Sequence, residues 1–342
     1  MRVFITLSLA ILLFSCSQTK SSKTFTSVKV TDLFTDSVSI RALEVMDGSV
    51  AFAGTGGIFG TVDQQTGQIR AKQQRYDTIY PEFRAVAHTS SDFFMLSAGR
   101  PALLFKTGNQ GLMELVYKED EEGVFYDAMA FWNEKEGLAA GDEMGGCLSL
   151  LITRDGGSTW NKIDCADLPE TIPGEGAFAA SNTNIAIVGD RAWVGTTEGR
   201  IWYTPDRGKS WEVFKTPVRS DEPTLGIYTL DFYSDEVGIA MGGDYTTPDG
   251  NLGNKAITED GGRTWELLAE GEIPGYTSCV QFVPGSGGQG LVAVSYSGIS
   301  YSSDRGKKWS TLSEEPFYTL KFVNDSIAYA AGKFRISRLK FQ

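Results

Sequence analysis

One short phrase recurs along this chain, and its repetition constrains the fold more than any other feature. The phrase has the form Asp-x-Gly-x-x-Trp, and the Asp residues of its four copies follow one another after 51, 54 and 44 residues. Repeats at this period indicate stacked units of a few strands each, because a single unit cannot bury its own apolar face. The copies are Asp155, Gly157 and Trp160; Asp206, Gly208 and Trp211; Asp260, Gly262 and Trp265; and Asp304, Gly306 and Trp309.

Each copy lies between two short apolar or alternating runs, so we expect it to form a hairpin loop between the third and fourth strands of a unit. The Asp carboxylate can accept hydrogen bonds from N–H groups of its own loop, Gly supplies a positive φ, and the indole buries apolar surface. These roles predict a structural turn rather than a reaction centre. Weaker copies occur at Asp63 and Asn109, at a similar spacing.

Two further strand patterns recur with the phrase. A strand ending in small residues precedes each turn, as at 51–54, and another strand precedes that one, as at 41–45. Both patterns occur seven times, which predicts an all-β, seven-bladed β-propeller of four-stranded blades. The last unit stops after its third strand, at 335–339, whereas 27–31 is an additional strand before the first unit. We therefore expect the N-terminal strand to close the last blade, which removes an open sheet edge.

These residues resemble the Asp-box (BNR) propellers, which include sialidases, sortilin-type receptors and photosystem assembly factor-like proteins. The resemblance covers about residues 27–342. The unit made of 129–131, 137–141 and 153–160 looks most like the photosystem assembly factor-like branch. The resemblance implies a propeller that binds proteins or ligands and assists the assembly or maintenance of protein complexes; the sialidase branch implies a glycoside hydrolase instead.

The first 16 residues resemble a lipoprotein signal peptide. An apolar run follows Arg2 and is too short to span a bilayer, and Leu13-Phe14-Ser15-Cys16 looks like a lipobox. Cys16 would become the lipidated N-terminus, 17–26 a flexible tether and 27–342 the propeller domain. With Ser17 after the cysteine, the resemblance implies an outer-membrane lipoprotein of the cell envelope that faces the periplasm. The alternative is an ordinary secretory signal that is cleaved elsewhere.

Composition excludes several classes of function. The net charge of −12 argues against nucleic acid and against direct adhesion to anionic lipid, which leaves the lipid anchor as the contact with a membrane. The chain has one histidine and no Cys-x-x-Cys pair, so we expect no cofactor and no metal. His88 takes the strand position that Phe131, Phe232 and Phe282 hold in other units, and we expect it in the core. We expect a monomer.

Two of the remaining cysteines are candidates for a disulfide, because the envelope permits disulfides. Cys147 opens the third strand of its unit and Cys165 closes the fourth, at positions that face each other across the same hairpin as Ile152 and Trp160. A register slip of one residue would instead send the two side chains to opposite faces. Cys279 lies on an innermost strand and is expected to be a small buried residue.

Propeller geometry predicts where a binding site would lie. The loops that enter the innermost strands crowd one face of the central channel, with 176–180 as the innermost strand of the fourth unit. We expect a ring of polar side chains there that binds a protein terminus, a peptide or a small anion; the alternative is a solvated rim without a ligand. The ring is Arg41, Arg84, Asp127, Glu175, Tyr228, Ser278 and Tyr318, with Arg100, Asp142, Asp244 and Tyr245 above it.

The same ring permits an enzymatic alternative. Sialidases resemble it in using arginines for the substrate carboxylate, a Tyr nucleophile activated by Glu, and an acidic Asp, which would cast Tyr318, Glu175 and Asp127 as catalytic residues. The family's arginine triad is not matched, since only Arg41 and Arg84 are present, and its Arg-Ile-Pro phrase is missing. We therefore expect a non-enzymatic binding propeller with an unknown envelope protein or peptide as partner. A purely structural spacer is the third class.

Overall fold

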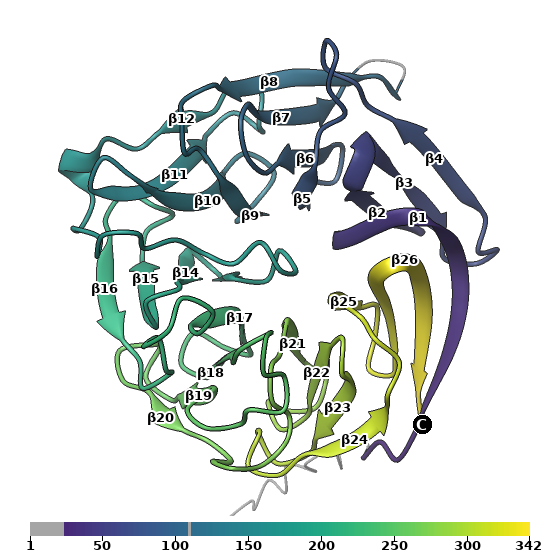
Figure 1. Cartoon of the computed structure of the whole chain (residues 1–342). Helices are drawn as coiled ribbons and strands as arrows, with labels where there is room; N and C mark the ends of the chain where they lie inside the picture. Colours follow the sequence, from purple (N-terminus) through teal and green to yellow (C-terminus); the bar gives the residue numbers. More distant parts are fainter. Residues whose placement is uncertain (1–23, 109–110) are drawn as a thin grey trace, which may run out of the picture.

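Antiparallel strands make up almost all the regular structure of this chain. The structure is a computed structural model that describes residues 24–108 and 111–342. This part of the chain contains no α-helix, and short 3-10 turns occur at Thr55–Gly57 and Cys165–Asp167. Its sheets are arranged around a common axis like the blades of a propeller (Figure 1). This arrangement confirms the prediction of an all-β propeller with four-stranded blades.

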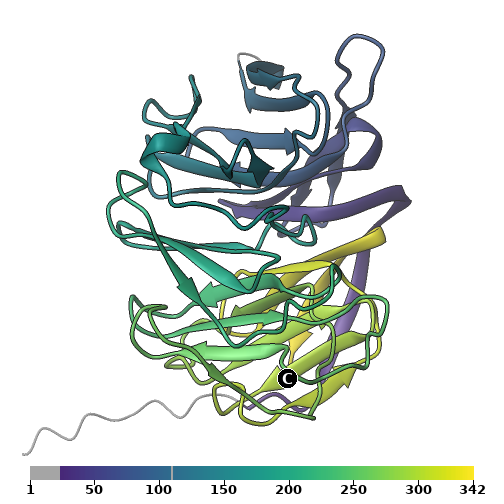
Figure 2. The same cartoon turned by 60° about the vertical axis from the view of Figure 1, so that its left-hand side comes forward.

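Five of the sheets have four strands each, and strands that follow one another in the chain are neighbours in the sheet. The first strand of each of these sheets lies nearest the axis (Figure 1), and Figure 2 shows the same sheets turned by 60° about the vertical axis. The strands of these five sheets are β5 (Phe83–His88), β6 (Phe93–Ser97), β7 (Ala102–Thr107) and β8 (Met113–Glu119); β9 (Tyr126–Phe131), β10 (Gly137–Met144), β11 (Cys147–Thr153) and β12 (Asn161–Lys162); β13 (Ile185–Val188), β14 (Arg191–Gly195), β15 (Arg200–Thr204) and β16 (Glu212–Lys215); β17 (Ile227–Phe232), β18 (Gly238–Gly242), β19 (Lys255–Thr258) and β20 (Glu266–Leu267); and β21 (Cys279–Phe282), β22 (Leu291–Ser295), β23 (Gly298–Ser302) and β24 (Ser310–Ser313).

The sixth sheet has six strands and corrects the predicted number of blades. The strands that we expected in separate first and last blades are joined, because β1 pairs with β26 along its first half and with β2 along its second half. Counted as hydrogen-bonded sheets, the propeller therefore has six blades, and the prediction of seven is wrong. The order in this sheet is β25 (Thr319–Phe322), β26 (Ile327–Phe341), β1 (Val28–Met46), β2 (Ser49–Gly54), β3 (Ile58–Asp63) and β4 (Ile69–Gln73).

The two long strands of this sheet are not straight. β26 turns back at Phe334, whose φ of 67° is in the left-handed region, so that the N–H of Phe341 donates to the carbonyl of Ser326 at 2.9 Å. β1 changes register between Thr35 and Ser39 as it passes from one pairing to the next. Apolar runs and turn residues mark strands in a sequence, but they do not mark a strand that continues from one sheet region into another.

The two ends of the described chain pair with each other, as the sequence predicts. Val28 lies opposite Phe341 in the antiparallel pairing of β1 with β26. Phe25 stacks on Phe341, with ring centroids 5.0 Å apart, and Asp32 forms an ion pair with Arg335 at 2.6 Å. The pairing leaves neither terminal strand as an open edge of the ring.

The core lies between neighbouring sheets. All seven residues of β11 are buried, whereas both residues of the outer strand β20 are exposed. Leu138 and Leu150 of one sheet pack against Val194 and Trp202 of the next. Burial of each such side chain stabilises the fold by about 1.5–3 kcal/mol, so stability comes mainly from contacts between blades.

The recurring phrase forms the turn between the third and fourth strands of four sheets. In the first copy, Asp155 accepts hydrogen bonds from the N–H and the hydroxyl of Thr159 at 2.9 and 2.7 Å. Burial alone would raise the pKa of Asp155, but the hydrogen bonds from Thr159 hold it below its ordinary value. The indole of Trp160 contacts Phe131 of its own sheet and Phe94 of the neighbouring sheet. Both carboxylate contacts recur at Asp206 and Asp260, and the contact with the N–H recurs at Asp304.

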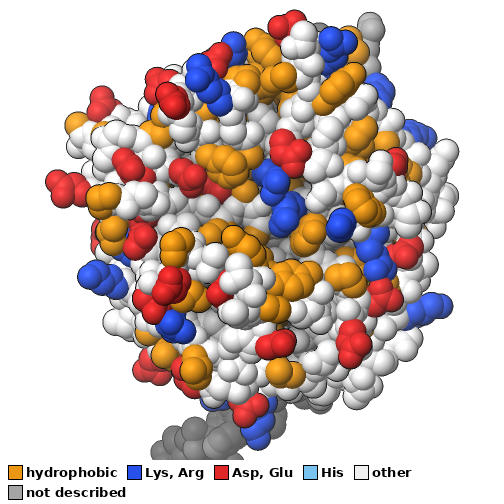
Figure 3. Space-filling view, in the orientation of Figure 1, with side chains coloured by type: hydrophobic (Ala, Val, Ile, Leu, Met, Phe, Trp, Pro, Cys, Tyr) orange, Lys and Arg blue, Asp and Glu red, His pale blue; other side chains and the backbone are white. Residues whose placement is uncertain are grey.

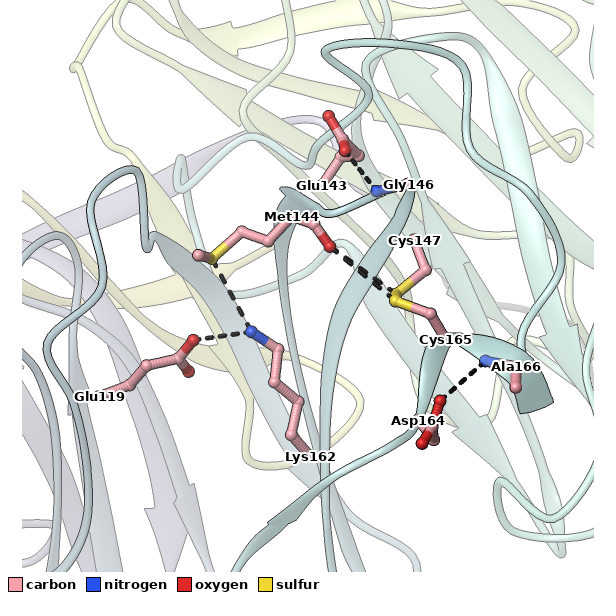
Figure 4. Close-up of a disulfide and its surroundings, with 9 residues drawn as sticks. All are labelled: Glu119, Glu143, Met144, Gly146, Cys147, Lys162, Asp164, Cys165 and Ala166. Atoms are coloured by element: carbon pink, nitrogen blue, oxygen red, sulfur yellow. Dashed lines mark hydrogen bonds and ion pairs between the residues drawn. A yellow bond between two sulfur atoms is a disulfide. The ribbon is translucent and has the colours of Figure 1, made fainter.

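A disulfide joins Cys147 to Cys165, with their Cα atoms 5.5 Å apart (Figure 4). Cys147 begins β11, and Cys165 begins the 3-10 turn after β12. Cys279 is a free, buried thiol whose Sγ donates to the carbonyl of Leu320 at 3.7 Å. Burial raises the pKa of this thiol, which makes it a poor nucleophile.

Candidate binding site on the propeller axis

A loop of small and polar residues occupies the central channel. Residues 176–184, which we call the plug loop, form the last part of the segment between the 3-10 turn after β12 and β13, and they reach the middle of the ring (the teal loop in Figure 1). The sequence assigned 176–180 to an innermost strand, and this assignment is wrong because β13 at Ile185–Val188 holds that place. A backbone segment lies on the axis instead of an open channel.

The side chain of Asn182 attaches the plug loop to two sheets. Its Oδ1 accepts from the N–H of Met129 at 2.9 Å, and its Nδ2 donates to the carbonyl of Val86 at 2.7 Å. Asn182 itself has a φ of 61°, a conformation that Asn adopts more readily than most residues. Both contacts are buried.

Hydroxyl groups attach the plug loop to the other side of the ring. Thr183 Oγ1 lies 2.7 Å from Thr229 Oγ1, and Ser181 Oγ donates to the carbonyl of Ser278 at 2.5 Å. Thr319 Oγ1 in turn donates to the carbonyl of Ser181 at 3.0 Å. Together with Asn182, these contacts join the plug loop to five sheets and hold it firmly on the axis.

The plug loop separates two cavities. The upper cavity has a volume of about 450 Å³ and includes the first part of the plug loop, 177–180; the lower cavity has about 250 Å³ and includes Thr183. The remaining lining of the upper cavity is aromatic and basic. It consists of Arg41, Arg84, Phe125, Tyr228, Tyr245, Tyr276, Tyr296 and Tyr318.

β-Bulges hold four of the predicted ring residues at the level of the upper cavity. In β1 the register shifts between Ile40 and Ala42, which leaves Arg41 as the extra residue. The same register shift makes Arg84 the extra residue in β5, Asp127 the extra residue in β9 and Tyr228 the extra residue in β17. A bulge re-aims the side chain of its extra residue, and repetition at one level of the ring brings these side chains together near the axis.

The two arginines are held by few partners. Arg41 Nη1 donates to the carbonyl of Ala180 at 3.3 Å, and Arg84 Nη1 donates to the carbonyl of Ala179 at 3.4 Å. The guanidinium of Arg41 also stacks on the ring of Tyr318, 4.1 Å from its centroid. Glu82 pairs with Arg84 at 3.1 Å.

Both guanidinium groups keep unused hydrogen-bonding capacity. The Nε atoms of Arg41 and Arg84 are buried and have no hydrogen-bond partner among the described residues. Burial lowers the pKa of Arg41, and the neighbouring charge of Arg84 lowers it further. A bound anion would relieve this repulsion between the two guanidinium groups.

Tyrosines form the other wall of the upper cavity. Tyr276 lies at the centre of this group and contacts Tyr228, Tyr245 and Tyr296 at centroid distances of 4.9, 6.4 and 5.3 Å. Phe178 of the plug loop stacks on Tyr228 at 3.7 Å. Figure 3 shows basic side chains near the centre of one face of the molecule, with hydrophobic side chains beside them.

The predicted acids lie beneath this surface. Asp127 is fully buried, and burial together with the nearby carboxylate of Asp142 raises its pKa well above the ordinary value. Burial also raises the pKa of Asp142 to about 6, and its Oδ1 accepts from the N–H of Ala177 at 3.2 Å. Asp142 therefore holds the plug loop through Ala177, and neither carboxyl group lines the upper cavity.

Glu175 is also structural. It is fully buried, and its carboxylate accepts hydrogen bonds from Arg200, from Thr196 at 2.7 Å and from Trp202 at 3.1 Å. The catalytic alternative requires Glu175 beside Tyr318 and an accessible Asp127. The structure shows neither arrangement.

Two other predicted residues lie outside the cavity. Arg100 is exposed and pairs with Asp120 at 2.8 Å, and Asp244 accepts hydrogen bonds from Thr246 and Thr247 in its own loop. Cys16, the predicted lipidation site, lies outside the described residues. No described helix is long and apolar enough to cross a membrane.

Sequence reasoning missed several residues of the aromatic wall. Tyr276 and Tyr296 line the upper cavity but were not predicted. One signal was present: Tyr296 directly follows the second strand of its sheet, and Tyr245 comes three residues after the end of the second strand of the preceding sheet. His88 was expected in the core, but its side chain is 32% exposed and lines the lower cavity.

Comparisons with known proteins support the propeller fold. The family model described as Sortilin-Vps10 (sortilin, neurotensin receptor 3) matches residues 148–274. No curated protein matches the chain. A solved structure of YCF48 bound to D1 peptide is similar with a TM-score of 0.66 at 11% identity, over 94% of this chain and 99% of that one.

Two further solved structures are similar. YCF48 from Cyanidioschyzon merolae has a TM-score of 0.63 at 13% identity and covers 92% of this chain and 98% of that one. A GH74 xyloglucanase from Xanthomonas campestris has a TM-score of 0.65 at 16% identity, with 91% of this chain matching 53% of that chain. At these identities the likeness shows a shared fold alone.

Proposed function

We propose that this chain is a non-enzymatic binding propeller whose upper cavity takes a peptide segment of a partner protein. The observation that carries the proposal is the pair of guanidinium groups of Arg41 and Arg84, which line the upper cavity together beside an aromatic wall. Guanidinium groups bind carboxylates through paired N–H donors, and aromatic side chains bury apolar groups of a peptide. We expect the bound segment to carry an acidic side chain or a free C-terminus.

The likeness to a propeller whose solved structure contains a D1 peptide is consistent with this function. We further propose that Cys16 carries a lipid and that the chain faces the periplasm from the outer membrane, where it acts as an assembly or maintenance factor. A Cys16→Ser variant should then move from the membrane fraction to the soluble fraction and lose incorporation of a labelled fatty acid.

Fluorescent decapeptides provide the direct test of binding. A set that varies in net charge, and in free versus amidated C-terminus, should show saturable fluorescence polarisation for acidic members that also contain apolar residues. The double variant Arg41→Gln with Arg84→Gln should weaken binding by at least about tenfold, since each truncated charged contact costs on the order of 1 kcal/mol or more.

Arg100→Gln is the matched control, because it removes an exposed arginine outside the cavity. It should leave the affinity unchanged. Equal affinity of the double variant and the parent protein, with both still folded by circular dichroism, would overturn the proposal. A set in which acidic and basic peptides bind equally would do so as well.

A further inference from the structure

In four sheets an indole packs into the gap towards the preceding sheet, next to the outer strand. Each of these tryptophans comes directly before the fourth strand and belongs to an apolar cluster that spans both sheets; they are Trp160, Trp211, Trp265 and Trp309. Asn161 pairs with Ile152, so Trp160 lies in the hairpin position opposite the last residue of β11. An indole is thus the ordinary filling of this gap in the propeller.

The sheet of β5 to β8 has a methionine instead of this indole. Met113 lies opposite Thr107, the last residue of β7, which is the hairpin position that Trp160 takes in the next sheet. Its side chain packs in the gap between this sheet and β1–β3, beside Met46 and Phe59. A thioether is smaller than an indole, so space remains in this gap.

The residue that would face an indole here is smaller as well. In the next gap Phe94 contacts Trp160, with ring centroids 6.4 Å apart. The position of Phe94 corresponds to Ala51 in β2, because their pairing partners, Ala87 and Glu44, each lie three residues after a bulge. Two large aromatic side chains of one gap therefore correspond to a methionine and an alanine in the other.

A groove with a volume of about 360 Å³ lies in this gap, and it is lined by residues of the outer strands β4 and β8 (Figure 1). The lining surface is mostly apolar, and its large apolar side chains are Met46, Phe59, Phe93 and Met113. Methionine sulfur atoms and phenyl rings both make favourable contacts with aromatic rings. The groove therefore suits a planar aromatic group.

The charged side chains of the groove are both cationic. Arg70 and Lys72 are exposed, and they lie on one face of β4 because they are two residues apart. No acidic side chain of the described residues lines the groove. The charge of Arg70 contributes to the lowered pKa of Asp63, but hydrogen bonds within the turn of Asp63 are the main cause. In a chain with a net charge of −12, this pair of cations favours an anionic occupant.

Apolar surface continues beyond the groove along β8. Leu115 is 39% exposed and lies on the same face of the strand as Met113, and Leu112, directly before Met113, is 65% exposed. A free aromatic molecule in the groove would leave both leucines in water. A chain segment that places an aromatic side chain in the groove can cover them, which favours a protein segment as the occupant.

We propose that this groove docks a segment of a partner protein in which a tryptophan stands between acidic residues. The indole takes the kind of position that Trp160 holds in the next gap, and the carboxylates pair with Arg70 and Lys72. The groove shares no lining residue with the upper cavity, so it is a second site that does not depend on the first.

Methionine methyl groups provide a specific probe, because Met46 and Met113 line the groove and no methionine lines the upper cavity. In protein labelled with ¹³C at the methionine methyl groups, Met46→Leu and Met113→Leu assign the two resonances by their loss. A blocked pentapeptide with a tryptophan between two aspartates should shift both resonances along a saturable curve, through the ring current of the indole. Replacement of its tryptophan by alanine, or of both aspartates by lysine, should weaken binding by at least about tenfold. No saturable shift at either methionine, or equal affinity for the lysine peptide, overturns the proposal.

Two changes in the protein test the site without reliance on one substitution. Met113→Trp supplies the indole from within the chain and should abolish the shift at Met46. Arg70→Gln with Lys72→Gln removes two exposed charges and should weaken binding by about threefold or more. Full affinity in both groove variants contradicts the proposal.

The matched control is Arg338→Gln with Lys340→Gln, which removes two exposed charges at the same spacing from β26. It should leave the affinity unchanged, and an equal loss in the control would show that only net charge matters, which also contradicts docking in the groove. The double variant Arg41→Gln with Arg84→Gln should keep the methionine shifts, because those side chains line the upper cavity. The two proposals therefore fail independently.

Discussion

Asn182 Oδ1 accepts a hydrogen bond of 2.9 Å from the backbone N–H of Met129, and the same side chain donates to Val86. One amide group on the plug loop thereby connects two neighbouring sheets at the axis. An open channel would leave these backbone groups to water, whereas the plug loop satisfies them within the protein. The propeller axis is therefore a structural centre as well as the floor of the proposed peptide site.

Asn182→Gly should lower the free energy of unfolding by about 2–4 kcal/mol, because two buried hydrogen bonds are lost and two backbone groups remain without partners. Glycine accepts the φ of 61° at this position, so the loss reports the side chain and not backbone strain. Asn182→Ala should cost slightly more, since alanine adds strain. Urea denaturation measures both, and a loss below 0.5 kcal/mol for the glycine variant would show that Asn182 does not hold the plug loop.

Gly157→Ala should be far more destabilising than Gly285→Ala, although both glycines have a φ of 74°. A Cβ at 157 would lie 2.2 Å from Cε1 of Phe94, whereas a Cβ at 285 meets no atom within 4 Å. We expect about 1 kcal/mol for Gly285→Ala from backbone strain, and about 3 kcal/mol or more for Gly157→Ala. Thermal melting of the two variants checks the order. Equal losses would mean that Phe94 moves aside freely.

The fold was largely predictable because its signals are local. The phrase around Asp155 specifies a turn through its own backbone contacts, and the recurrence of this phrase implies repeated sheets. The joining of β1 to β26 was not predictable, since it depends on where a continuous strand changes partners. The plug loop was missed for a related reason: 176–180 has the small, apolar residues of an innermost strand, but pairing is decided by the sheet and not by composition.

The candidate site was predictable in position but not in detail. Arg41, Arg84, Tyr228 and Tyr318 do meet at one cavity, because equivalent positions of a propeller lie at the same level of the axis. The burial of Glu175 was not predictable, since it depends on Arg200 of a later strand. Which residues of different repeats come into contact depends on how the ring closes, and a pattern within one repeat does not show this.

Tyr318→Leu should weaken binding of an acidic peptide by about threefold to tenfold, and Tyr318→Phe should leave it unchanged. The ring of Tyr318 lies 4.1 Å from the guanidinium of Arg41, and a phenylalanine ring preserves this cation–π contact, which contributes on the order of 1 kcal/mol. Fluorescence polarisation measures both variants. Any glycoside turnover that Tyr318→Phe abolishes would favour the enzymatic alternative instead.

Reduction of the Cys147–Cys165 disulfide should lower the free energy of unfolding by about 3 kcal/mol, as expected when a crosslink across a sequence separation of 18 is opened. The paired variant Cys147→Ser with Cys165→Ser should match the reduced protein and should not respond to dithiothreitol. Cys279→Ala provides the control, because this thiol is free and buried. If the paired variant still lost stability on reduction, the disulfide would not be the group responsible.

The stability of the protein should depend on pH through Asp142. Burial raises its pKa from 3.8 to about 6 in the folded state, so the folded state binds this proton more tightly than the unfolded chain does. The stabilisation is fully present below about pH 4 and is lost as the pH rises towards 6. An amide at this position carries no charge, can accept from Ala177 and can donate to Asp127. Asp142→Asn should therefore be more stable than the parent by about 2–3 kcal/mol above pH 6.5 and equally stable near pH 4.

The control for this pH effect is Asp244→Asn, which should be less stable than the parent protein, whereas Asp142→Asn should be more stable. Hydrogen bonds from Thr246 lower the pKa of Asp244 to about 2, so its contribution is present above pH 4 and does not change between pH 4.5 and 7. Urea denaturation across this range gives the free energy of unfolding of each variant relative to the parent protein. Every other titrating group is present in both proteins, so its contribution cancels in this difference. A difference between Asp142→Asn and the parent that is constant from pH 4 to 7 would show that Asp142 titrates like an exposed carboxyl group. The plug loop would then not depend on the protonation of the acids beneath it.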